Sequence, residues 1–164
     1  MEDEKSKYPV EVIAPDDLIS RCCFSINGVR PLDLATDFTF SDPNHVFPNT
    51  LSAVWRKYAV ERHDVDQRGE HIAREKNQRN KRVKKIVSYT GFRTALADDI
   101  RSIRTERDFG LAVDHAPSNT FRAHAHISIV SIGNPAATFT VNDKRDVVSE
   151  LISRMPLDEP AAII

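Results

Sequence analysis

FGLAVDH (residues 109–115) and FRAHAHISI (residues 121–129), separated by the turn-forming stretch PSNT (residues 117–120), are the most regular part of the sequence. Apolar and polar residues alternate through both segments, as they do in strands with one buried face. The proline, serine and asparagine between the segments favour a reversal of the chain. This stretch predicts a β-hairpin and makes an antiparallel sheet the basis of the fold.

Outward from the hairpin, the run CCFSI (residues 22–26) predicts another strand. It ends at Asn27-Gly28, a pair that favours positive φ and a tight turn, with residues 29–34 as the returning strand. Helical spacing of apolar residues and capping residues predicts helices at 51–59, 91–104 and 143–154, and the charged segment 66–85 predicts an exposed helix that breaks at Gly69 or a loop. The order of elements favours an α+β fold, a mainly antiparallel sheet with about three to four helices packed on one face.

Composition predicts one domain spanning residues 1–164, with a polar arm (1–8) and a loose tail (157–164). The chain is 40% hydrophobic and 29% charged, a balance typical of globular proteins. The acidic first residues do not resemble a signal peptide and no apolar run is long enough to span a bilayer, so we expect a cytoplasmic protein with no membrane contact. Cys22 and Cys23 are adjacent, which predicts a buried, reduced pair rather than a disulfide.

The second strand of the hairpin carries the residues most suited to chemistry. Arg122, His124, His126 and Ser128 share its polar face, because alternate side chains of a strand point the same way. Matching the apolar faces of the two strands places Asp114 opposite His124, where a carboxylate raises the basicity of an imidazole. These five residues are the candidate catalytic site.

Three interpretations of this face remain open. In the first, a histidine acts as acid or base on a phosphate or phosphodiester, Ser128 donates a hydrogen bond and Arg122 binds the anion. In the second, His124, His126 and Asp114 bind a divalent metal, with a further ligand from the group His63, Asp64, Asp66, Glu70 and His71. In the third, the face is only the solvated or covered side of a sheet.

The tetrapeptide His126-Ile-Ser-Ile129 resembles one arm of the two-histidine phosphoesterases, whose motif is His, hydrophobic, Ser or Thr, hydrophobic. That resemblance implies cleavage of cyclic or RNA-end phosphodiesters by two such arms across a cleft. The other histidines of the chain do not begin a second arm. P-loop and Gly-x-Gly-x-x-Gly motifs are also missing from the sequence, which argues against nucleotide cofactors bound through the standard loops.

The segment 74–85 holds seven basic residues and one acidic residue. Such a row matches the phosphates of RNA or DNA, although the net charge of −1 for the whole chain is unlike that of most nucleic-acid-binding proteins. A solvated helix face and a docking surface for an acidic protein are the alternatives. The residues expected to contact nucleic acid are Arg74, Arg79, Lys81, Arg82, Lys84 and Lys85.

Two functional hypotheses of different class follow. The first is a small domain that binds or hydrolyses phosphodiesters or nucleic acid through the histidine strand and the basic segment. The second is a non-catalytic accessory or adaptor subunit of an intracellular complex, for which the charged segments are docking surfaces.

Overall fold

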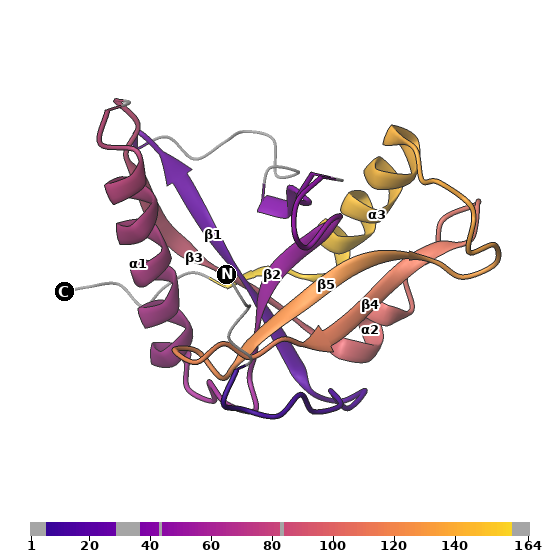
Figure 1. Cartoon of the computed structure of the whole chain (residues 1–164), viewed down its shortest axis with the longest axis horizontal. Coiled ribbons are helices and arrows are strands. Elements are labelled where there is room, and N and C mark those ends of the chain that lie inside the picture. The colour runs from indigo at the N-terminus through magenta and orange to yellow at the C-terminus, as the bar shows by residue number, and fades with distance from the viewer. Residues whose placement is uncertain (1–5, 29–36, 43, 83, 159–164) are drawn as a thin grey trace.

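A computed structural model of the chain describes residues 6–28, 37–42, 44–82 and 84–158. Figure 1 shows its strands and helices. The strands are β1 (Leu18–Ile26), β2 (Thr50–Trp55), β3 (Val87–Leu96), β4 (Phe109–His115), β5 (His124–Ser131) and β6 (Leu157–Asp158). The helices are α1 (Arg62–Arg79), α2 (Ala97–Arg101) and α3 (Val141–Arg154).

The six strands form one sheet in the order β4-β5-β2-β1-β3-β6, and every neighbouring pair is antiparallel. The expected α+β class is therefore confirmed. The expectation that all helices lie on one face is wrong, because α1 lies against β1 and β3 while α2 and α3 lie on the other side of the sheet (Figure 1). The sheet thus has two covered faces over part of its width.

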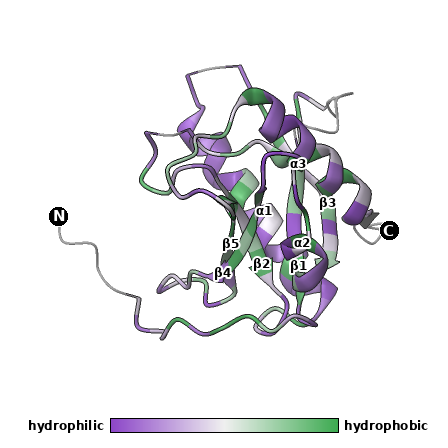
Figure 2. Ribbon diagram, turned by 90° about the vertical axis from the view of Figure 1, so that its right-hand side faces the viewer, coloured by the Kyte–Doolittle hydropathy of each residue, from purple (hydrophilic) through white to green (hydrophobic). Residues whose placement is uncertain are grey.

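Each face has its own group of buried side chains. The larger group joins the sheet to α2 and α3, and it includes Trp55, Ile127 and Leu151, each fully buried. The smaller group lies under α1 and includes Val65 and Phe92. Figure 2 shows hydrophobic residues concentrated where β2, β4 and β5 lie side by side. Because α1 packs mainly on β3 and β1, the polar face of the hairpin is only partly covered.

The hairpin predicted from the alternating segments is confirmed as β4 and β5, but its register differs from the expected one by two residues. Val113 lies opposite Ile127, and Asp114 lies opposite His126 instead of His124. The face assignment is unaffected because strand side chains repeat every two residues. Ala125 and Ile127 are buried, as predicted.

The expected helices at 51–59 and 91–104 are wrong over most of their length. Residues 50–55 form β2, a central strand with Trp55 buried on one face and Val54 on the other. A strand buried on both sides lacks alternation, so its apolar residues also fit helical spacing. Residues 87–96 form β3, and only 97–101 are helical.

Helix α1 begins and ends earlier than expected, at Arg62 and Arg79, and it continues through Gly69 without a break. The side-chain amide of Asn77 donates to the carbonyl of Val87 (2.8 Å) and accepts from its backbone N–H (2.7 Å), which attaches the end of α1 to the start of β3. The last helix is confirmed as α3, whose first turn is capped by Thr140 and Asp143.

The ends of the chain complete the fold. Asn27 and Gly28 have positive φ, as predicted, whereas the expected return strand 29–34 lies outside the described residues. Leu157 and Asp158, expected within the loose tail, pair with β3 as β6. Within the part of the chain that the structure describes, no helix is both long and apolar enough to cross a membrane.

Candidate functional site

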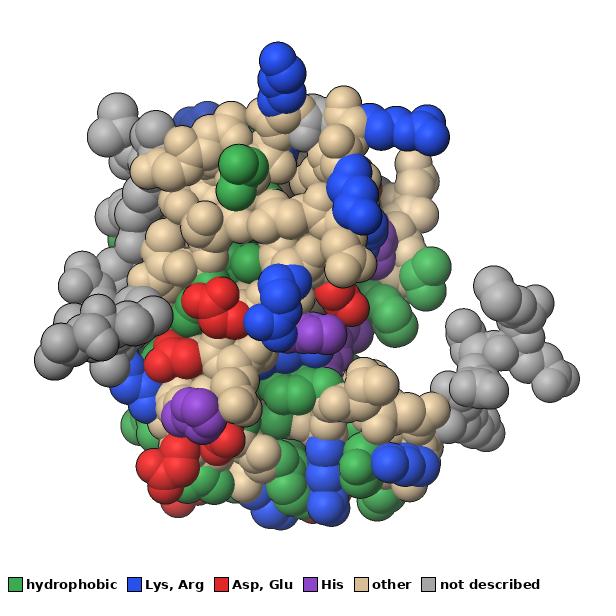
Figure 3. Space-filling model, turned by 90° about the vertical axis from the view of Figure 1, so that its left-hand side faces the viewer, with side chains coloured by type: hydrophobic (Ala, Val, Ile, Leu, Met, Phe, Trp, Pro, Cys, Tyr) green, Lys and Arg blue, Asp and Glu red, His purple; other side chains and the backbone are tan. Residues whose placement is uncertain are grey.

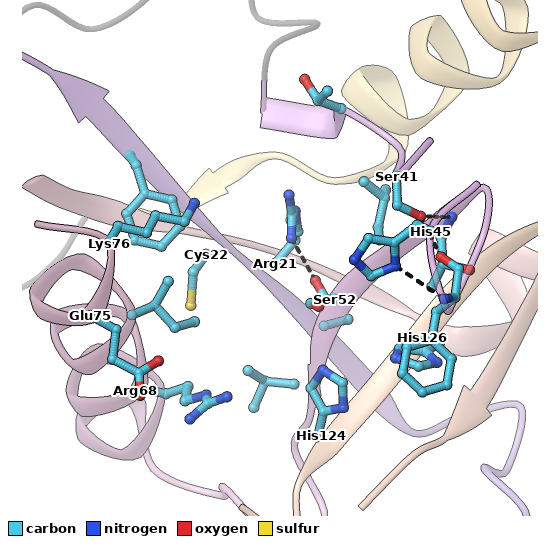
Figure 4. A pocket seen from close by; sticks show the side chains of 18 of the residues that line it. Arg21, Cys22, Ser41, His45, Ser52, Arg68, Glu75, Lys76, His124 and His126 are labelled. Atoms are coloured by element: carbon cyan, nitrogen blue, oxygen red, sulfur yellow. Dashed lines mark hydrogen bonds between the residues drawn. The ribbon is translucent and has the colours of Figure 1, made fainter. Parts of the chain in front are cut away.

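A cavity of about 360 Å³ lies on the α1 side of the sheet, between that helix and the loop that precedes β2 (Figure 4). We call it the cationic cavity because arginine and lysine dominate its charged lining. Its floor is formed by β1, β2 and β5, with Arg21, Ser52, His124 and His126. Its walls are formed by Arg68, Ile72, Glu75, Lys76 and Arg79 of α1 and by Ser41, His45 and Phe47 of the loop.

His124 is held in one tautomer. Its Nδ1 lies 2.8 Å from the carbonyl oxygen of Ala116, which only accepts hydrogen bonds, so Nδ1 carries the proton. Nε2 is then an unprotonated acceptor, and no described residue donates to it. Burial lowers the pKa of His124, and the positive charge of Arg68, which extends toward it from α1 in Figure 4, lowers it further. The imidazole is therefore neutral at pH 7 and presents a lone pair to the cavity.

His126 is the second imidazole of the cavity. Its ring centroid lies 4.9 Å from that of His124 and 4.8 Å from that of Phe47. Burial lowers its pKa to about 4, and His124 contributes to this shift, whereas Asp114 opposes it from the neighbouring strand. Both imidazoles are thus uncharged at neutral pH, unlike the arginines around them.

The cations of the cavity come from two elements. Arg68, Lys76 and Arg79 project from one face of α1, at helical spacing, and Arg21 projects from β1. Burial lowers the pKa of Lys76, and the neighbouring charges of Arg21, Arg79 and Lys85 lower it further. An ammonium group that is repelled by other cations lies in a positive potential, and such a potential attracts an anion.

Arg21 and Arg68 have no carboxylate within ion-pair distance among the described residues. The Arg21 guanidinium donates to two backbone carbonyls, of Asp37 at 3.1 Å and Ser52 at 2.8 Å. The Arg68 guanidinium lies 4.2 Å from the ring centroid of Phe121. Their full charges are therefore not neutralised by a salt bridge, and Glu75 is the one acidic side chain among the described residues lining the cavity.

The structure does not bring all five candidate catalytic residues together. Arg122 precedes β5, and its guanidinium stacks on Tyr58 (4.0 Å) and lies 3.7 Å from Glu11, away from the cavity lining. Ser128 shares a hydrogen bond with Thr50 (3.1 Å) at the edge of the floor. Asp114 is exposed on β4 beside His126. Of the five candidates, only His124 and His126 line the cavity.

The basic segment is divided between two places. Arg79 faces the cationic cavity, and Arg74 is exposed elsewhere on α1. The other four basic residues expected to contact nucleic acid lie beyond the end of α1, in the connection to β3. The prediction that the basic residues form one row on a single helix is therefore wrong. Figure 3 shows basic side chains at the top of this side of the molecule, over the end of α1 and the connection that follows. The basic residues of the connection, all exposed, are Lys81, Arg82, Lys84 and Lys85.

The metal hypothesis finds no complete ligand set in the described residues. No three histidine, cysteine, aspartate or glutamate side chains among them lie close enough to hold one ion. His71 instead lies 3.2 Å from Glu75, its neighbour one turn along α1. His124 and His126 remain as a two-nitrogen arm without a third ligand.

Sequence reasoning missed Arg21, Arg68, Lys76 and Phe47 as parts of the site. It also missed His115, whose Nδ1 accepts from the Glu11 N–H at 3.0 Å and whose Nε2 donates to the Arg122 carbonyl at 2.7 Å. With both nitrogens bonded and 3% exposure, His115 serves the packing of the hairpin. The spacing of Arg68, Ile72, Lys76 and Arg79 on one helix face was the available signal for the α1 wall.

Searches of protein-family models, of curated proteins and of solved structures find no match for this chain.

Proposed function

We propose that the cationic cavity binds the phosphate of a phosphodiester, from a nucleotide or nucleic acid, and that His124 acts there as a general base. One observation carries the proposal: His124, whose Nε2 is unprotonated, lines a cavity whose charged lining is four cations and one carboxylate. A base and a cluster of cations are the two components that phosphoryl chemistry needs from a protein.

The charge of the cavity favours a phosphate over a neutral ligand. Arginine guanidinium groups bind phosphate oxygens through paired, charge-assisted hydrogen bonds. Glu75 and Asp37 attract the charges of Arg68 and Arg21, but neither arginine forms a salt bridge with a described carboxylate. Burial and the repulsion of its cationic neighbours both lower the pKa of Lys76 in the free protein, and a bound phosphate relieves the repulsion. Binding should therefore raise this pKa and weaken as salt concentration rises.

The reaction that fits these groups is hydrolysis of the diester. A water molecule attacks phosphorus, and its proton passes to Nε2 of His124 as the new P–O bond forms. The P–O bond to the leaving oxygen breaks, that oxygen takes a proton from solvent, and the protonated His124 afterwards releases its proton to solvent. The cations stabilise the charge on the equatorial oxygens. His126 is neutral at pH 7 and stands beside His124 as a second acceptor of hydrogen bonds.

The test compares cavity variants with a matched control on the same helix. Lys76→Ala and His124→Ala are measured against Arg74→Ala, which removes an exposed charge outside the cavity. The readouts are anisotropy of fluorescein-labelled single-stranded RNA and DNA of about 12 nucleotides, and release of p-nitrophenol from bis-p-nitrophenyl phosphate. Far-ultraviolet circular dichroism verifies that each variant is folded.

We expect Lys76→Ala to weaken oligonucleotide binding about tenfold at low salt, and Arg74→Ala to leave it within about twofold. His124→Ala should reduce diester cleavage by a factor on the order of 10² while retaining binding. If the wild-type protein binds neither oligonucleotide at low salt, or if Arg74→Ala is as damaging as Lys76→Ala, the proposal is wrong.

The second candidate function, an accessory subunit, rests on the connection after α1. Lys81, Arg82, Lys84 and Lys85 are exposed, and none of them forms an ion pair with another described residue. Reversal of all four to glutamate would abolish docking to an acidic protein surface, whereas His124→Ala would leave such docking intact. Co-purification with tagged wild-type and charge-reversed chains distinguishes this function from the first.

A further inference from the structure

A second hollow, of about 700 Å³, adjoins the cationic cavity on the other side of the histidines. We call it the apolar hollow, because the described residues that line it include no Asp, Glu, Lys or Arg. Tyr8 and Val10 of the N-terminal segment, Pro117 of the hairpin turn and Phe47 of the loop before β2 form most of its walls. Val10 is 74% exposed and Phe47 is 54% exposed, so water now covers these apolar groups.

The two hollows share a wall. His124, His126 and Phe47 line both of them. A group bound at the imidazoles therefore has the cations on one side and the apolar side chains on the other. A ligand that fills both hollows needs an anionic part and an uncharged, apolar part joined through the atoms that lie at the histidines.

Phe47 is the aromatic side chain best placed to contact a planar ligand. Its ring meets His126 at a tilt of 54°, and more than half of the side chain remains accessible. Tyr8, the other aromatic ring of the hollow, already lies 5.1 Å from the cations of Lys7 and Arg122. An exposed phenylalanine beside a phosphate site is typical of proteins that stack a nucleobase.

We propose that the ligand is a nucleoside phosphate, with its phosphate in the cationic cavity and its base stacked on Phe47 in the apolar hollow. This inference rests on the proposed function and narrows its substrate class. A base is planar and uncharged at pH 7, which suits a hollow that offers rings, methyl groups and the Ser118 hydroxyl but no charge. The ribose would then lie over the two imidazoles, near Nε2 of His124.

The experiment separates the contribution of the base from that of the phosphate. Isothermal titration at pH 7 and low salt measures the binding of inorganic phosphate, ribose 5-phosphate and adenosine 5′-monophosphate to the full chain. The variants are Phe47→Ala, Phe47→Trp, and Val46→Ala as the control from the same loop. Val46 is 79% exposed and lines neither hollow.

Wild-type protein should bind the nucleotide about tenfold more tightly than the sugar phosphate, because one stacked base contributes that much to affinity. Phe47→Ala should weaken nucleotide binding about tenfold more than it weakens sugar-phosphate binding, and so remove this difference. Phe47→Trp should retain the difference, and Val46→Ala should match wild type. If Phe47→Ala does not fold, quenching of 2-aminopurine riboside 5′-monophosphate by the wild-type protein reports the stacking instead.

Two failures have different meanings. Equal affinity for the nucleotide and the sugar phosphate, or an equal loss of both in Phe47→Ala, would overturn the base site and leave the phosphate site standing. Failure of all three ligands to bind wild-type protein would overturn both proposals together.

Discussion

Replacement of Gly69 by alanine tests how α1 is seated on the sheet. Gly69 is buried, and a Cβ atom built on it lies 2.3 Å from both Cδ2 and Cε2 of Tyr89 and 2.8 Å from its Cγ. Nonbonded carbon atoms normally approach to about 3.5–4.0 Å. The ring of Tyr89 or the whole helix must therefore move by about 1 Å. Neither moves freely, because the Tyr89 hydroxyl donates to Asp66 of the same helix at 2.6 Å.

The expected cost follows from three contributions. Overpacking at a well-packed contact costs about 1–3 kcal/mol. Displacement of the tyrosine ring weakens a hydrogen bond to a carboxylate, a loss of about 1.5–3 kcal/mol if the bond breaks. Alanine offsets about 1 kcal/mol through its higher helix propensity. Gly69→Ala should therefore lower the free energy of unfolding by roughly 2–4 kcal/mol, or the melting temperature by roughly 5–15 °C.

Urea denaturation monitored by tryptophan fluorescence measures this change, since Trp55 is the one tryptophan of the chain and is fully buried. Gln67→Ala, at an exposed position of the same helix, is the control and should change stability by less than about 0.5 kcal/mol. In a Tyr89→Ala background the clash is gone, so Gly69→Ala should become neutral or stabilising by up to about 1 kcal/mol. An equal loss in both backgrounds, or a wild-type background stabilised by Gly69→Ala, would refute the reasoning.

Three other predictions concern buried polar groups and thiols. Arg93 and Asp37 form an ion pair at 3.0 Å with both side chains 4% exposed, so Asp37→Ala should lower the free energy of unfolding in urea by about 3–5 kcal/mol, and Asp37→Ala/Arg93→Met by less. Cys22 and Cys23 are buried thiols, and burial raises the pKa of Cys22 to about 12, so neither thiol should react with Ellman's reagent at pH 8 until the protein is unfolded. The pKa of His126 is lowered to about 4, below its unfolded value of about 6.5. Protonation of the unfolded chain should therefore lower the stability of the protein as pH falls from about 6.5 toward 4, whereas above about 6.5 this histidine has no such effect. Urea curves of His126→Leu should therefore vary less with pH between 4 and 7 than those of wild type, and parallel curves would contradict the shift.

The sequence was informative where only one face of a strand is fully buried. Segments 109–115 and 121–129 alternate because their polar sides are only partly covered, and this alternation predicted the hairpin and its buried face. It did not fix the register, since a shift of two residues keeps the same faces buried. The connection between β4 and β5 runs from residue 116 to residue 123, so Arg122 lies outside β5 and Asp114 pairs with His126.

The errors arose where both faces of a strand are covered. Val54 packs under α1 while Leu51 and Trp55 pack on the opposite side, so β2 has apolar residues at spacings that also fit a helix. Helical spacing also placed Phe92 and Ile100 on one stripe, but Phe92 belongs to β3 and Ile100 to α2, and they pack in different layers of the core. Local spacing does not reveal which layer a residue joins, because that depends on partners distant in the sequence.

The sequence predicted only the part of the candidate site that lies on one strand, because the other part depends on contacts between distant segments. His124 and His126 are neighbours on one strand, so a two-residue period was enough to place them together. Arg21 and Arg68 meet them only because β1 is the second strand from β5 and α1 crosses over it. The basic segment therefore indicated the right helix. Of its expected contact residues, however, only Arg79 lines the cavity, because Lys81, Arg82, Lys84 and Lys85 lie beyond the last turn of α1.

The helix that carries the cations is seated by residues that have no charge. Val65, Gly69 and Ala73 form the buried stripe of α1, and the missing side chain at position 69 lets the helix approach Tyr89 closely. Arg68 and Lys76 are one and three residues from this stripe, so their distance from the floor of the cavity is set by the same contact. A helix held farther from β3 would place both cations away from His124. The close contact at Gly69, a residue that the sequence alone suggested as a break in the helix, thus contributes both to the position of these cations and to the packing of α1.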